Sequence, residues 1–94
     1  MDAGRLVFVV TWRSSGDAAH VAAAIEQLRK PGGRAPKRGI PVVAVPFMGR
    51  AGGELCEGAG IGWLDLSGNA RILAPGVRIH IEGRPNRFKR PGRP

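Results

Sequence analysis

The apolar residues of this chain recur with two different periods, which separate predicted strands from predicted helices. Residues 6–10 and 42–45 are short, continuous apolar runs, typical of strands covered on both faces of a sheet. Between these runs, apolar residues recur at helical spacing, at Ala18, Val21, Ala22, Ile25 and Leu28. The first half of the chain is therefore predicted to form a strand, a helix whose apolar side faces the sheet, and a second strand.

Residues typical of helix ends flank this helical pattern. Residues 14–17 are Ser-Ser-Gly-Asp, and side chains of these types cap helix N-termini. Asp17 in the first turn and Arg29 in the last would both complement the helix dipole. Pro31 and Gly32 are expected to end the helix.

A weaker helix is predicted over residues 50–58. Gly52 and Gly53 oppose it, because each costs about 0.8 to 1 kcal/mol relative to alanine inside a helix. A narrow apolar stripe remains, formed by Ala51, Leu55 and Ala59. Gly58 or Gly60 would supply the left-handed residue that ends the helix.

The following residues predict three strands joined by tight turns. Gly68-Asn69 would be the two-residue loop of a hairpin between residues 61–67 and 70–74. Pro75-Gly76 fits the two central positions of a type II turn. Residues 77–82 then alternate between apolar and polar, as a strand with one wet face does.

The predicted order is β-α-β-α-β-β-β, an α/β fold with a small mixed sheet. The first three strands are expected to be parallel because right-handed crossovers would join them. Residues 1–83 are predicted to form a single domain. Residues 84–94 contain three prolines and one large hydrophobe, so they are predicted to be a basic tail or linker.

The net charge of +8 is concentrated in two segments without any acidic residue. Residues 29–38 and 84–94 carry five cations each, whereas the other 73 residues hold five cations and seven acids. Clustered cations outside the predicted core favour a polyanionic partner, and we expect non-specific contacts to the DNA backbone. The candidate contact residues are Arg34, Lys37, Arg38, Arg84, Arg87, Lys89, Arg90 and Arg93. A general bias toward Arg, Ala and Gly is the alternative explanation of this basicity.

The remaining reactive side chains predict neither a metal site nor a cofactor. Cys56 is the one cysteine, which excludes an internal disulfide and predicts a packed thiol in a reducing compartment. His20 and His80 have no ligands at metal-binding spacing and are predicted to lie at the surface. With no signal pattern and no run near the roughly 18 apolar residues of a membrane span, a cytoplasmic protein without membrane contact is expected.

Three segments together resemble a known family. They are Pro-Val-Val-Ala-Val-Pro-Phe at residues 41–47, Gly-Trp-Leu-Asp-Leu-Ser-Gly-Asn at 62–69 and Glu-Gly-Arg-Pro-Asn at 82–86. With them, residues 5–88 resemble the restriction-endonuclease-like domain of bacterial transcriptional regulators related to AbiEi-type antitoxins. The resemblance implies a nuclease-like fold, a role at DNA and a winged helix-turn-helix that follows the domain.

The resemblance also locates a degraded catalytic site. In active nucleases of that fold, an acidic residue and a Glu/Asp-x-Lys motif hold a divalent metal, which stabilises charge on the phosphate and activates water. The motif falls here on Thr11-Trp12-Arg13, where Thr11 brings no charge and Arg13 can hold a phosphate but not act as a base. We therefore treat Thr11, Arg13 and Asp65 as a relic site, and we do not expect cleavage by this mechanism.

Three side chains admit both a structural and a functional interpretation. A carboxyl group at Asp65 needs partners inside a sheet, either turn amides or Arg71, or else it faces a ligand. Trp63 is predicted to lie in the core. Trp12, beside Arg13 at a strand end, is left open between packing and stacking on bases.

Together these patterns favour a non-catalytic, nucleic-acid-associated module of a bacterial regulator. One alternative is a metal-dependent endonuclease whose migrated site uses Asp65 or Glu82. Another is a protein-interaction module that pairs the exposed edge of its last strands with a partner protein or a second copy. A truncated remnant is the third.

Overall fold

The computed structural model describes residues 6–29, 39–74 and 76–88, which form a five-stranded mixed sheet with two helices. The strands lie in the order β1-β2-β3-β4-β5, parallel from β1 to β3 and antiparallel from β3 to β5. The predicted order of elements and the parallel first three strands are confirmed. The elements are β1 (Phe8–Trp12), α1 (Ala18–Arg29), β2 (Ile40–Val45), α2 (Arg50–Ala59), β3 (Gly62–Asp65), β4 (Ala70–Ala74) and β5 (Val77–Ile81).

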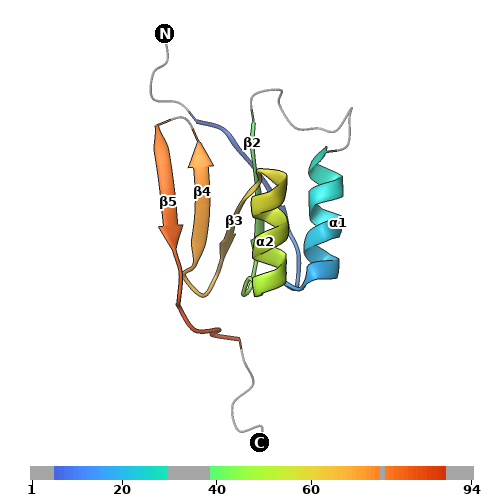
Figure 1. The fold of residues 1–94 in the computed structure, drawn as a ribbon, viewed down its shortest axis with the longest axis vertical. Coiled ribbons are helices and arrows are strands. Elements are labelled where there is room, and N and C mark those ends of the chain that lie inside the picture. Colours follow the sequence, from blue (N-terminus) through green and yellow to red (C-terminus); the bar gives the residue numbers. More distant parts are fainter. Residues whose placement is uncertain (1–5, 30–38, 75, 89–94) are drawn as a thin grey trace, which may run out of the picture.

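Both helices pack on the same face of the sheet. They lie side by side over β1, β2 and β3, and the hairpin of β4 and β5 extends past them (Figure 1). Both crossovers advance through the sheet in the same direction, so right-handed connections place both helices on one side. We call this side the helix-covered face and the opposite side the open face.

The main core lies between the two helices and strands β2 and β3. Residues 42–45 of β2 are at most 5% exposed, which confirms the prediction of a strand buried on both faces. Trp63 is 6% exposed and belongs to the core, as predicted. The buried cluster consists of Val21, Ala24, Ile25, Val43, Val45, Met48, Cys56, Ile61 and Trp63.

The apolar stripe predicted along α1 is partly wrong. Val21 and Ile25 are buried and Leu28 packs against them, but Ala18 and Ala22 are exposed. Ala24 is fully buried instead. The buried arc differs because α1 packs against α2 as well as against the sheet.

The stripe predicted along α2 is mostly wrong, because glycines form much of the packing surface and, of the three predicted residues, Ala59 alone packs against the core. Gly52, Gly53 and Cys56 are buried, while Leu55 is 40% exposed. A Cβ atom on Gly52 would collide with the Gly16 carbonyl oxygen and lie 2.8 Å from Val21 Cγ2. The missing side chain therefore allows α2 to approach the loop before α1. Gly60, with φ of 70°, ends the helix, as one of the two predicted glycines.

Strand β1 also differs from its prediction. It begins at Phe8 and not at Leu6, and it is an edge strand. Phe8, Val10 and Trp12 are 40%, 54% and 51% exposed, so coverage on both faces is wrong. A continuous apolar run does not reveal that the helices cover only one side of the sheet.

The hairpin between β3 and β4 is confirmed, with a loop different from the predicted one. The Asp65 amide donates to the Asn69 carbonyl at 2.9 Å, which leaves three residues, 66–68, in the loop. Gly68 alone among them has a positive φ, 104°, as in a type I turn closed by a left-handed glycine. At the next turn Gly76 has φ of 78°, as a type II turn requires, and Pro75 lies outside the described residues.

Candidate functional site

The best-defined polar cluster lies where β3 ends, around the buried side chain of Asp65. Its Oδ1 accepts the amides of Ser67 at 3.0 Å and Asn69 at 2.8 Å. Its Oδ2 accepts the Met48 amide at 3.0 Å and Asn69 Nδ2 at 3.1 Å. Of the two structural interpretations, turn amides are right, because Arg71 instead pairs with Glu57 at 3.5 Å. Asp65 thus joins the loop between β2 and α2 to the β3–β4 turn.

The same turn holds the segment that follows β5. Asn69 Oδ1 accepts the Arg84 amide at 2.9 Å, and Asn69 Nδ2 donates to the Arg84 carbonyl at 3.0 Å. Ser67 Oγ donates to the Pro46 carbonyl and accepts the Arg87 amide, both at 3.1 Å. The backbone at residues 84–87 is therefore fixed against the domain at two points. Residues 84–88 leave the body along this turn (Figure 1).

The side chains of Arg84 and Arg87 take no part in this anchoring. Both residues are exposed, and the stem of Arg84 passes over Gly68, whose Cβ position lies 3.4 Å from Arg84 Cγ. Among the described residues, neither guanidinium makes a hydrogen bond or an ion pair. The site therefore presents two cations on an anchored backbone.

A cavity of about 700 Å³ lies between this segment and the start of α2. Its charges are mixed, since three carboxyl groups share the wall with two guanidinium groups. Such a lining, to which Arg84 contributes one of the two cations, does not select a polyanion inside the cavity. Its lining residues are Phe47, Met48, Gly49, Arg50, Gly53, Glu54, Glu57, Trp63, Asn69, Glu82, Gly83 and Arg84.

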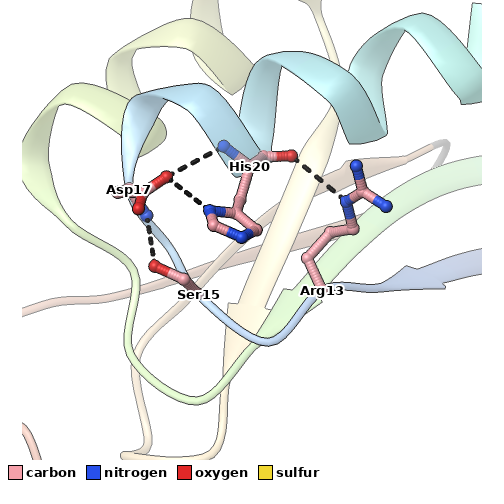
Figure 2. Close-up of polar contacts among 4 residues, drawn as sticks. All are labelled: Arg13, Ser15, Asp17 and His20. Carbon is pink, nitrogen blue, oxygen red and sulfur yellow. Dashed lines mark hydrogen bonds and ion pairs between the residues drawn. The ribbon is translucent and has the colours of Figure 1, made fainter.

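The residues predicted as a relic nuclease site do not come together. Thr11 lies on β1 and Asp65 on β3, with β2 between them, so their backbones are separated by two strand spacings, or roughly 10 Å. Arg13 Nε donates to the His20 carbonyl at 3.3 Å, which directs its side chain toward α1 (Figure 2). Both carboxyl oxygens of Asp65 accept hydrogen bonds from within the domain.

The two histidines pair with acidic neighbours at the surface. Asp17 Oδ1 accepts the His20 amide at 2.8 Å and lies 2.8 Å from His20 Nδ1 (Figure 2). These bonds lower the pKa of Asp17 to about 2. His80 Nε2 lies 3.0 Å from Glu82 Oε1, and this hydrogen bond lowers the pKa of Glu82.

No metal-binding cluster of three or more His, Cys, Asp or Glu side chains exists within residues 6–29, 39–74 and 76–88. Cys56 is fully buried, as predicted, and burial raises the pKa of its thiol to about 11. It packs as a small hydrophobe. Across the same residues, no helix is long and apolar enough to cross a membrane.

Sequence reasoning found Asp65 and the basic segment but missed the residues that connect them. The sequence predicts Ser67 as the end of a strand and Asn69 as part of a turn, although both side chains bond the backbone of residues 84–87. The signal was an Asn in a turn, whose amide can pair with a backbone amide and carbonyl at once. Six predicted contact residues, Arg34, Lys37, Arg38, Lys89, Arg90 and Arg93, lie outside the described residues.

Comparison with known proteins gives no relative: no family model, no curated protein and no solved structure matches the chain at a significant level.

Proposed function

We propose that this chain is a non-catalytic, nucleic-acid-associated module that contacts the DNA backbone through its basic segments. The proposal includes the resemblance to the restriction-endonuclease-like domain of bacterial regulators, with its nuclease site reduced to a structural role. The observation that carries it is the anchored backbone of Arg84 and Arg87, described above.

An anchored arginine pair suits phosphate recognition for a physical reason. A guanidinium group offers several donors in a fixed plane and can bond a phosphate at two points. Because Asn69 and Ser67 already fix the backbone, less conformational entropy is lost when these side chains bind. Contacts of this kind position a protein on DNA without reading its sequence.

The role of Asp65 supports a module without nuclease chemistry. A carboxyl group that binds Mg²⁺ must offer its oxygens to the metal. Both oxygens of Asp65 already accept hydrogen bonds from backbone amides, and metal binding would leave those amides without partners. The loss of these hydrogen bonds would destabilise the β3–β4 turn, which holds Arg84.

Fluorescence anisotropy with a labelled random duplex at low and physiological salt tests the proposal. For the full chain, we expect binding that weakens with salt at a log-log slope of about −0.9 per phosphate neutralised. The double variant Arg84→Gln/Arg87→Gln should reduce the magnitude of that slope by about 0.9 for each lost contact. A chain ending at Phe88 would report the share of Lys89, Arg90 and Arg93.

The matched control is Arg71→Gln/Arg78→Gln, which removes the same charge from strands β4 and β5. It should leave the slope nearly unchanged. Binding that does not respond to salt would refute the proposal. Equal losses in both double variants would show that net charge, and not the anchored pair, determines affinity.

A further inference from the structure

The open face of the sheet is apolar across all five strands. The strand register and the alternation of side chains along each strand determine which residues lie on this face. Every described residue there is apolar or glycine. Among the described residues, no helix or strand lies over this face, since α1 and α2 are both on the other side (Figure 1). The face consists of Phe8, Val10, Trp12, Ile40, Val42, Ala44, Gly62, Leu64, Ala70, Ile72, Ala74, Val77, Ile79 and Ile81.

The exposed part of this face is large for so small a chain. Its most exposed members are Phe8, Val10, Trp12, Ile79 and Ile81, at 38% to 54%. These five side chains expose on the order of 400 Å², divided between β1 and β5 at the two edges of the sheet. Half-buried neighbours bring the exposed apolar surface of the face to roughly 500 Å².

The chemistry of the face restricts its occupant. It offers no charged group and no side-chain hydrogen-bond donor except the Trp12 indole, so it cannot recognise a polyanion. A partner must bring an apolar surface of similar extent and few charges. A second copy of the same face meets both conditions.

The shape of the face also favours self-pairing. A row of large side chains, Phe8, Val10 and Trp12, follows the edge strand β1. Ile79 and Ile81 lie on β5 at the opposite edge, and between the two edges Val42, Ala44 and Ile72 are at most 8% exposed. In a twofold pair whose axis runs along the strands, the β1 row of each copy would lie against the β5 side chains of the other, as an isologous interface requires.

We propose that the open face is the interface with a second copy of this chain, packed sheet on sheet about 10 Å apart. Two such faces bury about 1,000 Å², the lower limit for a specific interface, so the dimer is reversible. The proposal does not rest on nucleic-acid binding, which uses the segment after β5. It also differs from pairing at a strand edge, because the contact is between faces.

Sedimentation equilibrium across a wide concentration range tests it. The full chain should approach about twice its monomer mass of 9.9 kDa at high concentration. Val10→Glu, at an exposed position of the open face, should remain a monomer over the same range. The matched control is Leu73→Glu, because Leu73 is 69% exposed on the other side of β4 and should leave the dimer intact.

The tryptophans give a second measurement that needs no variant. Trp12 is half exposed on the open face, whereas Trp63 is buried in the core. Dilution of the dimer should shift the emission to longer wavelength as Trp12 meets water. A chain that stays monomeric at all concentrations, or a dimer that persists in Val10→Glu, would overturn the proposal.

Discussion

The two faces of the sheet have similar residues over the parallel strands but very different cover. On the helix-covered face, Val43 is fully buried and Trp63 is 6% exposed beneath α1 and α2. On the open face, Val42 and Ala44 of the central strand β2 are also at most 5% exposed, but Val10 and Ile79 on the edge strands are 54% and 38% exposed. The difference comes from topology, because both crossovers run in the same direction and leave one face without a layer. Apolar character therefore does not by itself tell which residues are buried.

At β4 and β5, the two faces differ in residue type. Past the helices, the helix-covered side carries Arg71, Arg78 and His80 together with Leu73, which is 69% exposed, and it meets solvent there. The open face remains apolar at the same strands, through Ile72, Ile79 and Ile81. Three of the four side chains on the helix-covered side of β4 and β5 are thus polar, whereas those on the open face are all apolar, which is the pattern expected if the open face is covered by a partner.

The largest effect should come from the polar end of the helix-covered face. Asp65→Ala removes the acceptor of three backbone amides and should lower the free energy of unfolding by about 4 kcal/mol, since each unpaired buried group costs about 1 to 3 kcal/mol. Urea denaturation followed by circular dichroism measures this. Leu66→Ala, at a neighbouring exposed residue, is the control and should change stability by less than about 0.5 kcal/mol. Equal stabilities would mean that the turn does not depend on Asp65.

Gly52→Ala should be the next most damaging change. The added methyl group would collide with the Gly16 carbonyl oxygen and push against Val21, so we expect a loss of about 3 kcal/mol from overpacking. Gly58→Ala is a matched control on the same helix, because a Cβ there meets nothing within 4 Å. It should stabilise the chain by about 0.5 to 1 kcal/mol through helix propensity. Similar effects of both changes would contradict the close approach of α2.

Alanine substitutions at three valines of β1 and β2 compare how much burial on each face contributes to stability. Val43→Ala should cost about 2 kcal/mol, because Val43 is buried under the helices. Val10→Ala should cost about 0.5 kcal/mol in dilute solution, because half of its surface already meets water. Val42→Ala should fall between them, because Val42 is 1% exposed but lies on the face without helices. If the chain dimerises, the cost of Val10→Ala should rise with protein concentration.

The sequence predicted the elements well because their periods are local properties. The order of strands and helices, the hairpin at Gly68 and the core position of Trp63 could all be predicted from spacing and turn residues. The buried glycine side of α2 could not be predicted, because it depends on how closely Gly52 approaches Gly16, far away in sequence. For the same reason the anchoring of Arg84 by Asn69 was missed, since it joins a turn to a segment 15 residues later.

The smallest expected effect is a loss of stability at low pH through Asp17, which caps α1, the helix that covers β1 and β2. The pKa of Asp17 is about 2 in the folded chain and 3.8 in its unperturbed state, because the folded carboxylate accepts bonds from His20. Its contribution to stability is therefore complete above about pH 4 and is lost as the pH falls toward 2. Asp17→Asn keeps an N-cap side chain but cannot titrate, so its stability should fall less between pH 5 and pH 2 than that of the unmodified chain.

Urea midpoints at both pH values, compared between the two chains, isolate this effect from other carboxyl groups such as Glu82. The Asp17 side chain is exposed, so added salt should shrink the difference. Identical pH dependence in both chains would mean that the bonds to His20 do not persist in solution. In that case, packing of α1 against the sheet and α2 would hold the helix on the covered face without its cap.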